Sequence, residues 1–268
     1  MLKLIIGRAS SGKSTYIRNI IAEKASSGGD VTLIVPEQFS FESERMIIEM
    51  LGEKKASEVS VFSFTSLSER ILNEYCPDRK PPVTSAAKEV IMSLTLEALS
   101  EHLNVFSKCS RNRNTVSEIL HITDELIQCD VSTEDLTSAA QRSGNSILIQ
   151  KAEEISLISS LYSSMLEDRF SDDRYIINAA SDVIADKSLF TGKTVILDEF
   201  SGFTAQQNIL LKLLLTQCED VYITMCADSI HDTSMGTGAF SYPAENISRL
   251  TALAKMRCFR RRACHHVQ

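Results

Sequence analysis

Hydrophobic and polar residues follow two different patterns along this chain. Short apolar runs, typical of buried strands, occur at residues 2–6, 31–35, 59–62, 194–197 and 221–226. Stretches with apolar residues at helical spacing follow these runs. Alternating strands and helices predict the α/β class, with a parallel sheet covered by helices on both faces.

The middle of the chain contains helical patterns only. Pro77, Pro81 and Pro82 interrupt the alternation, and from Thr84 to about Asp186 the apolar residues recur at helical spacing. Capping boxes predict helix starts at three places along the whole chain. They are Thr115 with Glu118, Ser132 with Asp135, and Thr204 with Gln207. We therefore predict an all-helical subdomain inserted into the sheet domain.

The predicted domain organisation has four parts. They are a first sheet segment, the helical insertion, a second sheet segment and a terminal tail, at residues 1–80, 81–188, 189–255 and 256–268. The tail is basic and lacks a helical or strand period, in a chain of net charge −7. A Cys/His metal site and a nucleic-acid-binding tail are two interpretations. We favour a third, in which the reading frame is lost near residue 256 and the tail is unrelated sequence.

Composition limits the class of protein and its compartment. The chain has 268 residues, 43% of them hydrophobic, and no apolar run approaches the length of a membrane span. It also lacks a signal peptide, and its seven cysteines contain no C-x-x-C pair, so we expect reduced thiols, a cytoplasmic location and no membrane partner. Because the net charge is acidic, any contact with nucleic acid must be local.

The strongest motif follows the first strand. Residues 7–15, Gly-Arg-Ala-Ser-Ser-Gly-Lys-Ser-Thr, match the phosphate-binding pattern G-x-x-x-x-G-K-[ST]. Gly7 and Gly12 permit a tight turn whose N–H groups cradle a polyphosphate, Lys13 reaches its outer phosphates, and the Ser14 hydroxyl can bind Mg²⁺. The expected ATP-binding residues of this loop are Gly7, Arg8, Ala9, Ser10, Ser11, Gly12, Lys13, Ser14 and Thr15.

A second acidic site follows the strand at residues 194–197. Asp198 and Glu199 end this apolar run, as in the Walker B element of P-loop ATPases. We expect the strand to lie beside the P-loop strand, so that Asp198 and Ser14 hold Mg²⁺ while Glu199 orients the attacking water. Lys13, Asp198 and Glu199 are the candidate catalytic residues. The alternative is that the two acids are ordinary loop or cap residues.

Several stretches together resemble a known family. The P-loop, V-P-E-Q-F-S-F-E-S-E-R at 35–45, F-S-F-T-S-L at 62–67 and D-E-F-S-G-F-T-A-Q-Q at 198–207 resemble successive motifs of superfamily 1 helicases. Their wording is similar to that of the AddB family, which belongs to the bacterial AddAB helicase–nucleases, over residues 1 to about 255. The resemblance implies a RecA-like first motor domain with a 1B-like helical insertion, and ATP with Mg²⁺ as cofactors.

The resemblance also implies partners and further residues. It implies an AddA-type helicase–nuclease partner and action on single-stranded DNA or double-strand ends, in break resection and recombinational repair. AddB proteins also carry a nuclease domain and an iron–sulfur cluster, but this chain resembles only their N-terminal part and receives neither. Arg8 and Gln38 are further nucleotide-side candidates. Phe39, Phe62 and Phe64 lie in motifs that line the DNA groove, and are either base-stacking residues or core.

Two positions depart from the pattern of active motors. Ser201 stands where superfamily 1 motors usually have Gln, and G-D-x-x-Q is absent around residues 225–228. A motor of this kind is expected to be weak or non-translocating. Three hypotheses remain open. The chain is an ATP-binding helicase-like region, a nucleotide-binding scaffold for an AddA-type partner without turnover, or a P-loop small-molecule kinase whose helices form a lid.

Overall fold

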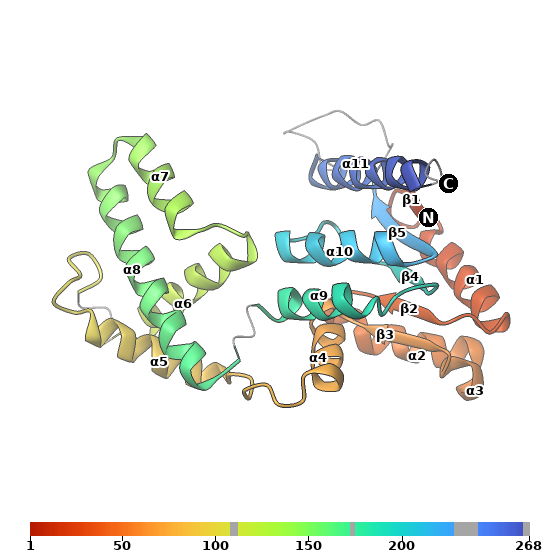
Figure 1. The fold of residues 1–268 in the computed structure, drawn as a ribbon, viewed down its shortest axis with the longest axis horizontal. Helices are drawn as coiled ribbons and strands as arrows, with labels where there is room; N and C mark the ends of the chain where they lie inside the picture. The colour runs from red at the N-terminus through yellow and green to blue at the C-terminus, as the bar shows by residue number, and fades with distance from the viewer. Residues whose placement is uncertain (108–111, 172–174, 228–240, 265–268) are drawn as a thin grey trace. The chain divides into compact units, whose positions relative to one another are not determined.

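The chain divides into two compact units. The structure, a computed structural model, describes residues 1–107, 112–171, 175–227 and 241–264, with side chains for all of these except 241 and 254–264. A sheet unit comprises residues 1–75 and 177–268, and a helical unit comprises residues 76–176. Figure 1 shows the elements of each unit, which are described separately below.

The sheet unit confirms the predicted α/β class. Within the described residues, five parallel strands form one sheet in the order β1-β5-β4-β2-β3. The strands are β1 (Leu2–Gly7), β2 (Val31–Ile34), β3 (Val59–Phe62), β4 (Thr194–Leu197) and β5 (Asp220–Cys226). Each strand predicted from an apolar run is present, with its bounds within one residue of those expected.

The strand order corrects one expectation. The strand that ends at Asp198 does not lie beside the P-loop strand, because β5 pairs with both β1 and β4 and separates them. β1 is therefore an edge strand of the described sheet and is only half-buried, whereas β4 is fully buried. Apolar runs of similar length carry no information on order, which is set by tertiary pairing.

Helices cover both faces of this sheet. They are α1 (Lys13–Ser26), η1 (Glu37–Phe39), α2 (Ser40–Leu51), α3 (Glu53–Ala56), α4 (Phe64–Tyr75), α9 (Ile176–Lys187), α10 (Ala205–Gln217) and α11 (Ser241–Cys264). Ile17 and Ile21 of α1 and Ile47 of α2 share one core cluster with the strand residues Ile196 and Tyr222. The strand residues that alternate with these point to the opposite face and are also buried, and α10 contacts β5 (Figure 1).

The helix α9 differs from the predicted domain boundary. The sequence assigns it to the insertion, up to residue 188, but it belongs to the sheet unit. Ile184 of α9 is fully buried, and its carbonyl accepts a hydrogen bond of 2.8 Å from the side chain of Gln217 on α10. Helical periodicity shows that a helix has a buried face but does not show which core that face joins.

The helical unit has its own core. Its helices are α5 (Ser85–Ala98), α6 (Arg113–Gln128), α7 (Thr133–Ser143) and α8 (Ser146–Arg169). Met92 of α5, Ile119 of α6, and Ile158 and Tyr162 of α8 pack into one cluster. These stripes of apolar residues are therefore core, as their spacing predicts.

Two of the three predicted helix starts are confirmed. Both reciprocal hydrogen bonds of the capping box form at Ser132 with Asp135 and at Thr204 with Gln207. The prediction at Thr115 is wrong, because α6 begins at Arg113 and its N-cap is Asn112, whose side chain accepts the N–H of Asn114 at 3.1 Å. Asparagine is a better N-cap than threonine and precedes it here.

The last helix is longer than its pattern predicts. The sequence predicts a weak helix near residues 244–256, whereas the backbone of α11 continues to Cys264. The absence of Gly and Pro between 244 and 264 permits this. The side chains of the tail lie outside the described residues, so the reading-frame hypothesis stays a prediction. Within the part of the chain that is described, no helix is both long and apolar enough to cross a membrane.

One buried carboxylate organises the loop that follows α5. Glu154 of α8 is 5% exposed and accepts backbone N–H hydrogen bonds from Asn104 (2.9 Å), Val105 (3.1 Å) and Phe106 (3.0 Å). Charged acceptors make stronger hydrogen bonds than neutral ones. The carboxylate therefore joins this loop to the core of the helical unit.

We expect Glu154→Gln to lower the free energy of unfolding of the helical unit by about 2 kcal/mol, because the amide removes the charge and turns one acceptor into a donor. Equilibrium denaturation followed by circular dichroism measures this. Glu153→Gln, one residue away on the exposed side of α8, is the control and should change little. Equal stability of the two variants would contradict the role given to Glu154.

A second charged cluster joins β1 to β5. Asp220 accepts a hydrogen bond of 2.9 Å from Lys3, and its carboxylate lies 3.5 Å from Lys24 and 3.7 Å from the N-terminal amino group. Burial raises the pKa of Asp220, but the hydrogen bond and charge of Lys3, with the N-terminus and Lys24, outweigh burial and hold this pKa below its ordinary value. The carboxylate therefore stabilises the fold when it is ionised.

The lowered pKa of Asp220 fixes the direction of its pH dependence. Its contribution is complete above the ordinary pKa of 3.8 and is lost as the pH falls through the lower, folded-state pKa. We expect the difference in unfolding free energy between the wild type and Asp220→Asn to shrink below that pH. Asp30→Asn, which alters a more exposed ion pair with Lys193, is the control. A difference that persists unchanged down to about pH 2 would contradict the assignment.

Candidate functional site

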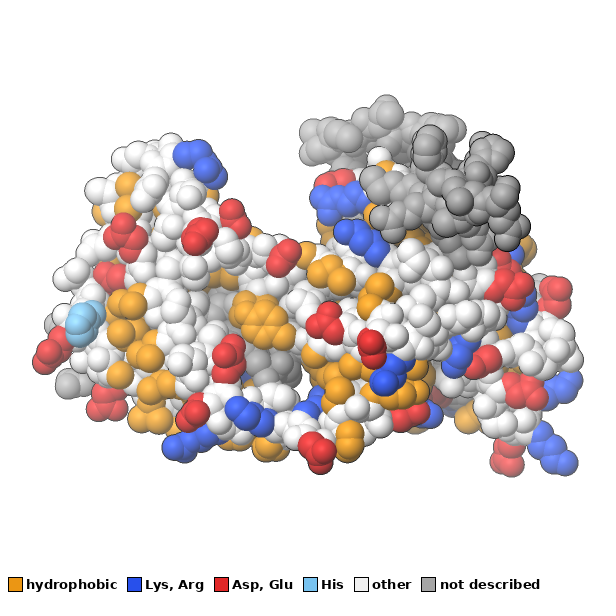
Figure 2. Space-filling model, viewed as in Figure 1, with side chains coloured by type: hydrophobic (Ala, Val, Ile, Leu, Met, Phe, Trp, Pro, Cys, Tyr) orange, Lys and Arg blue, Asp and Glu red, His pale blue; other side chains and the backbone are white. Residues whose placement is uncertain are grey.

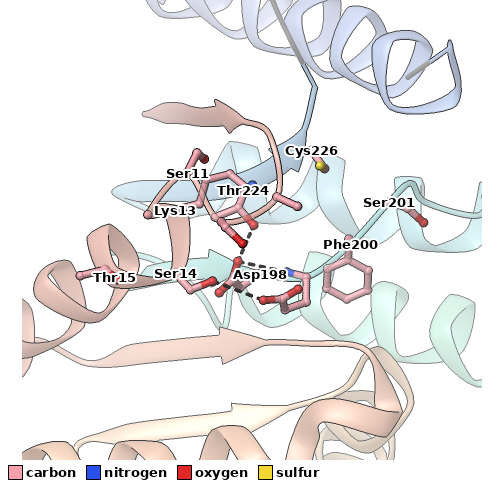
Figure 3. A pocket seen from close by; sticks show the side chains of 13 residues that line it. Ser11, Lys13, Ser14, Thr15, Asp198, Phe200, Ser201, Thr224 and Cys226 are labelled. Carbon is pink, nitrogen blue, oxygen red and sulfur yellow. Dashed lines mark hydrogen bonds between the residues drawn. The ribbon is translucent and has the colours of Figure 1, made fainter. Parts of the chain in front are cut away.

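A cavity of about 460 Å³ lies at the carboxyl ends of β1, β4 and β5 (Figure 3). Three segments of the sheet unit line it: Ala9 to Thr15 after β1, Asp198 to Ser201 after β4, and Thr224 with Cys226 on β5. The carboxyl edge of a parallel sheet is where α/β proteins usually bind ligands. The cavity therefore unites the two motifs that are far apart in the sequence.

The first segment has a backbone that requires its glycines. A Cβ on Gly7 would lie 2.4 Å from Ser11 Oγ, and Gly12 has φ +89°, in the left-handed region. The helix α1 begins directly at Lys13, with Gly12 as an N-cap that makes no side-chain bond. The first backbone N–H groups of α1 are thus left for a ligand, beside the positive end of the helix dipole.

Lys13 lies on the phosphate loop itself. Its ammonium donates hydrogen bonds to the carbonyls of Gly7 (2.9 Å) and Arg8 (2.8 Å). These contacts keep the positive charge next to the loop. A polyphosphate in the cavity would compete for the same ammonium with a stronger, charge-assisted hydrogen bond.

The acidic segment lies opposite the start of α1. Asp198 follows β4 directly and is 9% exposed, and its Oδ1 accepts hydrogen bonds from the Glu199 N–H (3.0 Å) and the Thr224 hydroxyl (2.5 Å). Glu199 has φ +66°, rare for a residue with a side chain, and its Oε1 accepts a hydrogen bond of 3.3 Å from Ser14 Oγ. Ser14, Asp198 and Glu199 thus converge (Figure 3).

This donor set fits Mg²⁺ bound together with phosphates. A hydroxyl and one or two carboxylates are the hard oxygen ligands that Mg²⁺ takes from proteins when substrate phosphates complete its coordination. Among the described residues, no group of three or more His, Cys, Asp or Glu side chains could hold a metal by itself. The site is therefore suited to a metal that arrives with a nucleotide.

The structure separates two of the candidates from the others. Gln38 lies in η1 with an exposed side chain and lines neither this cavity nor an adjoining hollow of about 220 Å³. Arg8 is exposed and contributes its backbone carbonyl to Lys13, without lining the cavity. Every other residue of the predicted loop from Ala9 to Thr15 lines it, as do Asp198 and Glu199.

The phenylalanines of the DNA-groove motifs have different environments. Phe64 is buried and packs edge-on against Phe200 and Phe203, with ring centroids 5.4 and 6.2 Å apart, so the core interpretation of Phe64 is confirmed. Phe62 lies under the guanidinium of Arg70, 5.6 Å from the ring centroid. Phe39 packs on the core below α1 and lines the adjoining hollow.

The loop after the carboxylates is held by α11. Asn246 of α11 is buried, accepts the N–H of Phe203 at 3.2 Å, and donates to the carbonyl of Tyr242 at 2.9 Å. A Cβ on Gly202 would lie 2.2 Å from the ring of Tyr242, so only glycine fits this approach. The acidic segment is therefore fixed at both ends, by β4 and by α11.

Sequence reasoning missed Thr224 of β5, which contacts Asp198 directly. One signal was present: Thr224 is a polar residue within the apolar run that forms β5. That signal has meaning only once β5 is known to separate β1 from β4.

Both motifs fall within a match to a known family. The family model described as "ADDB, N-terminal" matches residues 4–265. This chain belongs to the AddB N-terminal family. The resemblance drawn from the motifs is thereby confirmed.

Curated relatives of this AddB N-terminal chain share one name, which makes each of them the B-type component of an ATP-dependent helicase/deoxyribonuclease. The relatives from Clostridium acetobutylicum and Clostridioides difficile are each 31% identical to it, over 95% and 94% of the chain. The relative from Ruminiclostridium cellulolyticum is 30% identical over 95% of the chain. The chain spans 22% of the length of each of these relatives.

Proposed function

We propose that this chain is the ATP-binding, helicase-like region of an AddB-type protein. The observation that carries the proposal is the convergence of Lys13, Ser14, Asp198 and Glu199 on one cavity, in a chain of the AddB N-terminal family. The P-loop residues from Gly7 to Thr15 would bind the phosphates of ATP.

Each residue of the site has a proposed role. Lys13 leaves the carbonyls of Gly7 and Arg8 and binds the outer phosphates, together with the first N–H groups of α1. Ser14 and Asp198 hold Mg²⁺, which neutralises charge on the phosphates when it is bound. Glu199 orients the attacking water and accepts its proton.

The proposed partners follow from the relatives' name. Because these relatives are named as one component of an ATP-dependent helicase/deoxyribonuclease, we propose an AddA-type partner and DNA as substrate, in double-strand break resection and recombinational repair. With net charge −7, and with positive and negative side chains interspersed among the described residues on the face in Figure 2, DNA contact would be local. Within this chain we assign no nuclease residue and no iron–sulfur ligand.

One observation favours a second candidate function. Ser201 lines the cavity at the position where active superfamily 1 motors usually have Gln. A site without that amide would bind ATP and yet lack the link to DNA, and the chain would then be a nucleotide-binding scaffold for its partner. Hydrolysis of ATP that single-stranded DNA stimulates supports the motor, and tight binding without turnover supports the scaffold.

Lys13→Ala tests the binding proposal. We expect it to weaken Mg·ATP binding by about 10- to 100-fold, the effect of losing one charge-assisted phosphate contact of about 1.5–3 kcal/mol. Isothermal titration calorimetry on the folded 268-residue chain measures this. Lys212→Ala, an exposed lysine on α10, is the matched control and should bind as the wild type does. A folded wild-type chain that binds no nucleotide would overturn the proposal.

A further inference from the structure

Thr224 occupies a position that only the strand order creates. In the parallel register, Ile5 of β1 lies opposite Thr224, and Leu197 of β4 lies opposite Ile223. Asp198, the next residue after Leu197, is therefore level with Thr224 on the neighbouring strand. Adjacent strands lie about 4.8 Å apart, a distance that a threonine hydroxyl and an aspartate carboxylate can bridge.

Both side chains also point to the same face of the sheet. Ile196 and Tyr222, two residues before Asp198 and Thr224, belong to the core cluster below α1. Alternate residues of a strand share a face, so Asp198 and Thr224 point toward the α1 side, where the P-loop ends (Figure 3). The hydroxyl then reaches Asp198 Oδ1 at 2.5 Å, and Thr224 itself is 2% exposed.

The hydrogen bonds divide the work of the two carboxylate oxygens. Oδ1 accepts from both the Thr224 hydroxyl and the Glu199 N–H. In the described part of the chain, no hydrogen-bond donor is paired with Oδ2, which leaves this oxygen to a cation. The Thr224 hydroxyl has a single proton, and because that proton is used by Asp198 the hydroxyl cannot also donate to a phosphate.

We infer that Thr224 is a positioning residue, which fixes the Asp198 carboxylate so that it can hold the divalent cation of a bound nucleotide. The inference rests on the proposed function and deepens it. Groups that hydrogen-bond a metal ligand orient it, and their loss typically weakens metal binding by about 10- to 100-fold. A residue acting only through Asp198 should matter when the metal is present and should not matter for the nucleotide alone.

The test compares nucleotide affinity with and without metal. The probe is AMP-PNP, a non-hydrolysable ATP analogue, titrated calorimetrically into the 268-residue chain in Mg²⁺ or in EDTA. We expect Thr224→Val, which keeps the shape and removes the hydroxyl, to lose about tenfold in affinity in Mg²⁺ and to stay within about twofold of the wild type in EDTA. Thr224→Ser, which restores the hydroxyl, should bind as the wild type does.

Two further variants make the test robust. Thr32→Val removes a buried threonine from β2, away from the carboxylates, and should leave both affinities unchanged. Thr224→Cys keeps a weak donor and should lose affinity in Mg²⁺ to an intermediate extent. It carries the test if the valine variant does not fold.

The outcomes separate this inference from the proposed function. A wild-type chain that binds AMP-PNP in Mg²⁺, with variants at 224 that bind equally well or lose equal affinity in Mg²⁺ and in EDTA, overturns the positioning role and leaves the proposed function standing. A folded wild-type chain that binds no nucleotide in either condition overturns the proposed function, and this inference with it. A loss confined to Mg²⁺ and reversed by serine supports the inference.

Discussion

The parallel pairing of β1, β5 and β4 is the constraint on which the site depends. Their common register brings three carboxyl ends to one edge, so that the P-loop leaves β1 at the level where Asp198 leaves β4. Because β5 separates them, the distance between loop and carboxylate is that of two strand spacings, and the strand between them must supply a compatible side chain. Thr224 meets this requirement by donating to Asp198.

The same constraint explains which parts of the site the sequence could predict. The residues from Ala9 to Thr15, and the pair Asp198 and Glu199, belong to short contiguous motifs, and each motif was identified without knowledge of its neighbours. Thr224 was not identified, because its importance depends on a strand order that apolar runs do not encode. Gln38 was a candidate only through family resemblance, and its exposed position in η1 keeps it out of the cavity.

Fold prediction succeeded and failed for similar reasons. Strands and capping boxes depend on a few adjacent residues, so the five strands and the caps at Ser132 and Thr204 were predicted well. The position of α9 depends on packing between distant segments, here on the contact of Ile184 with Gln217, and periodicity could not place it. The two units have separate cores, and the proposed chemistry lies entirely in the sheet unit.

Hydrogen–deuterium exchange with and without Mg·AMP-PNP tests most directly whether the two motifs form one nucleotide site. The account predicts slower exchange in residues 8–15 and 198–201 together, and unchanged exchange in the helices α5 to α8. Bound nucleotide would shield the N–H groups of the loop and stabilise the acidic segment through the metal. Protection of neither segment, or protection confined to the helical unit, would contradict the account.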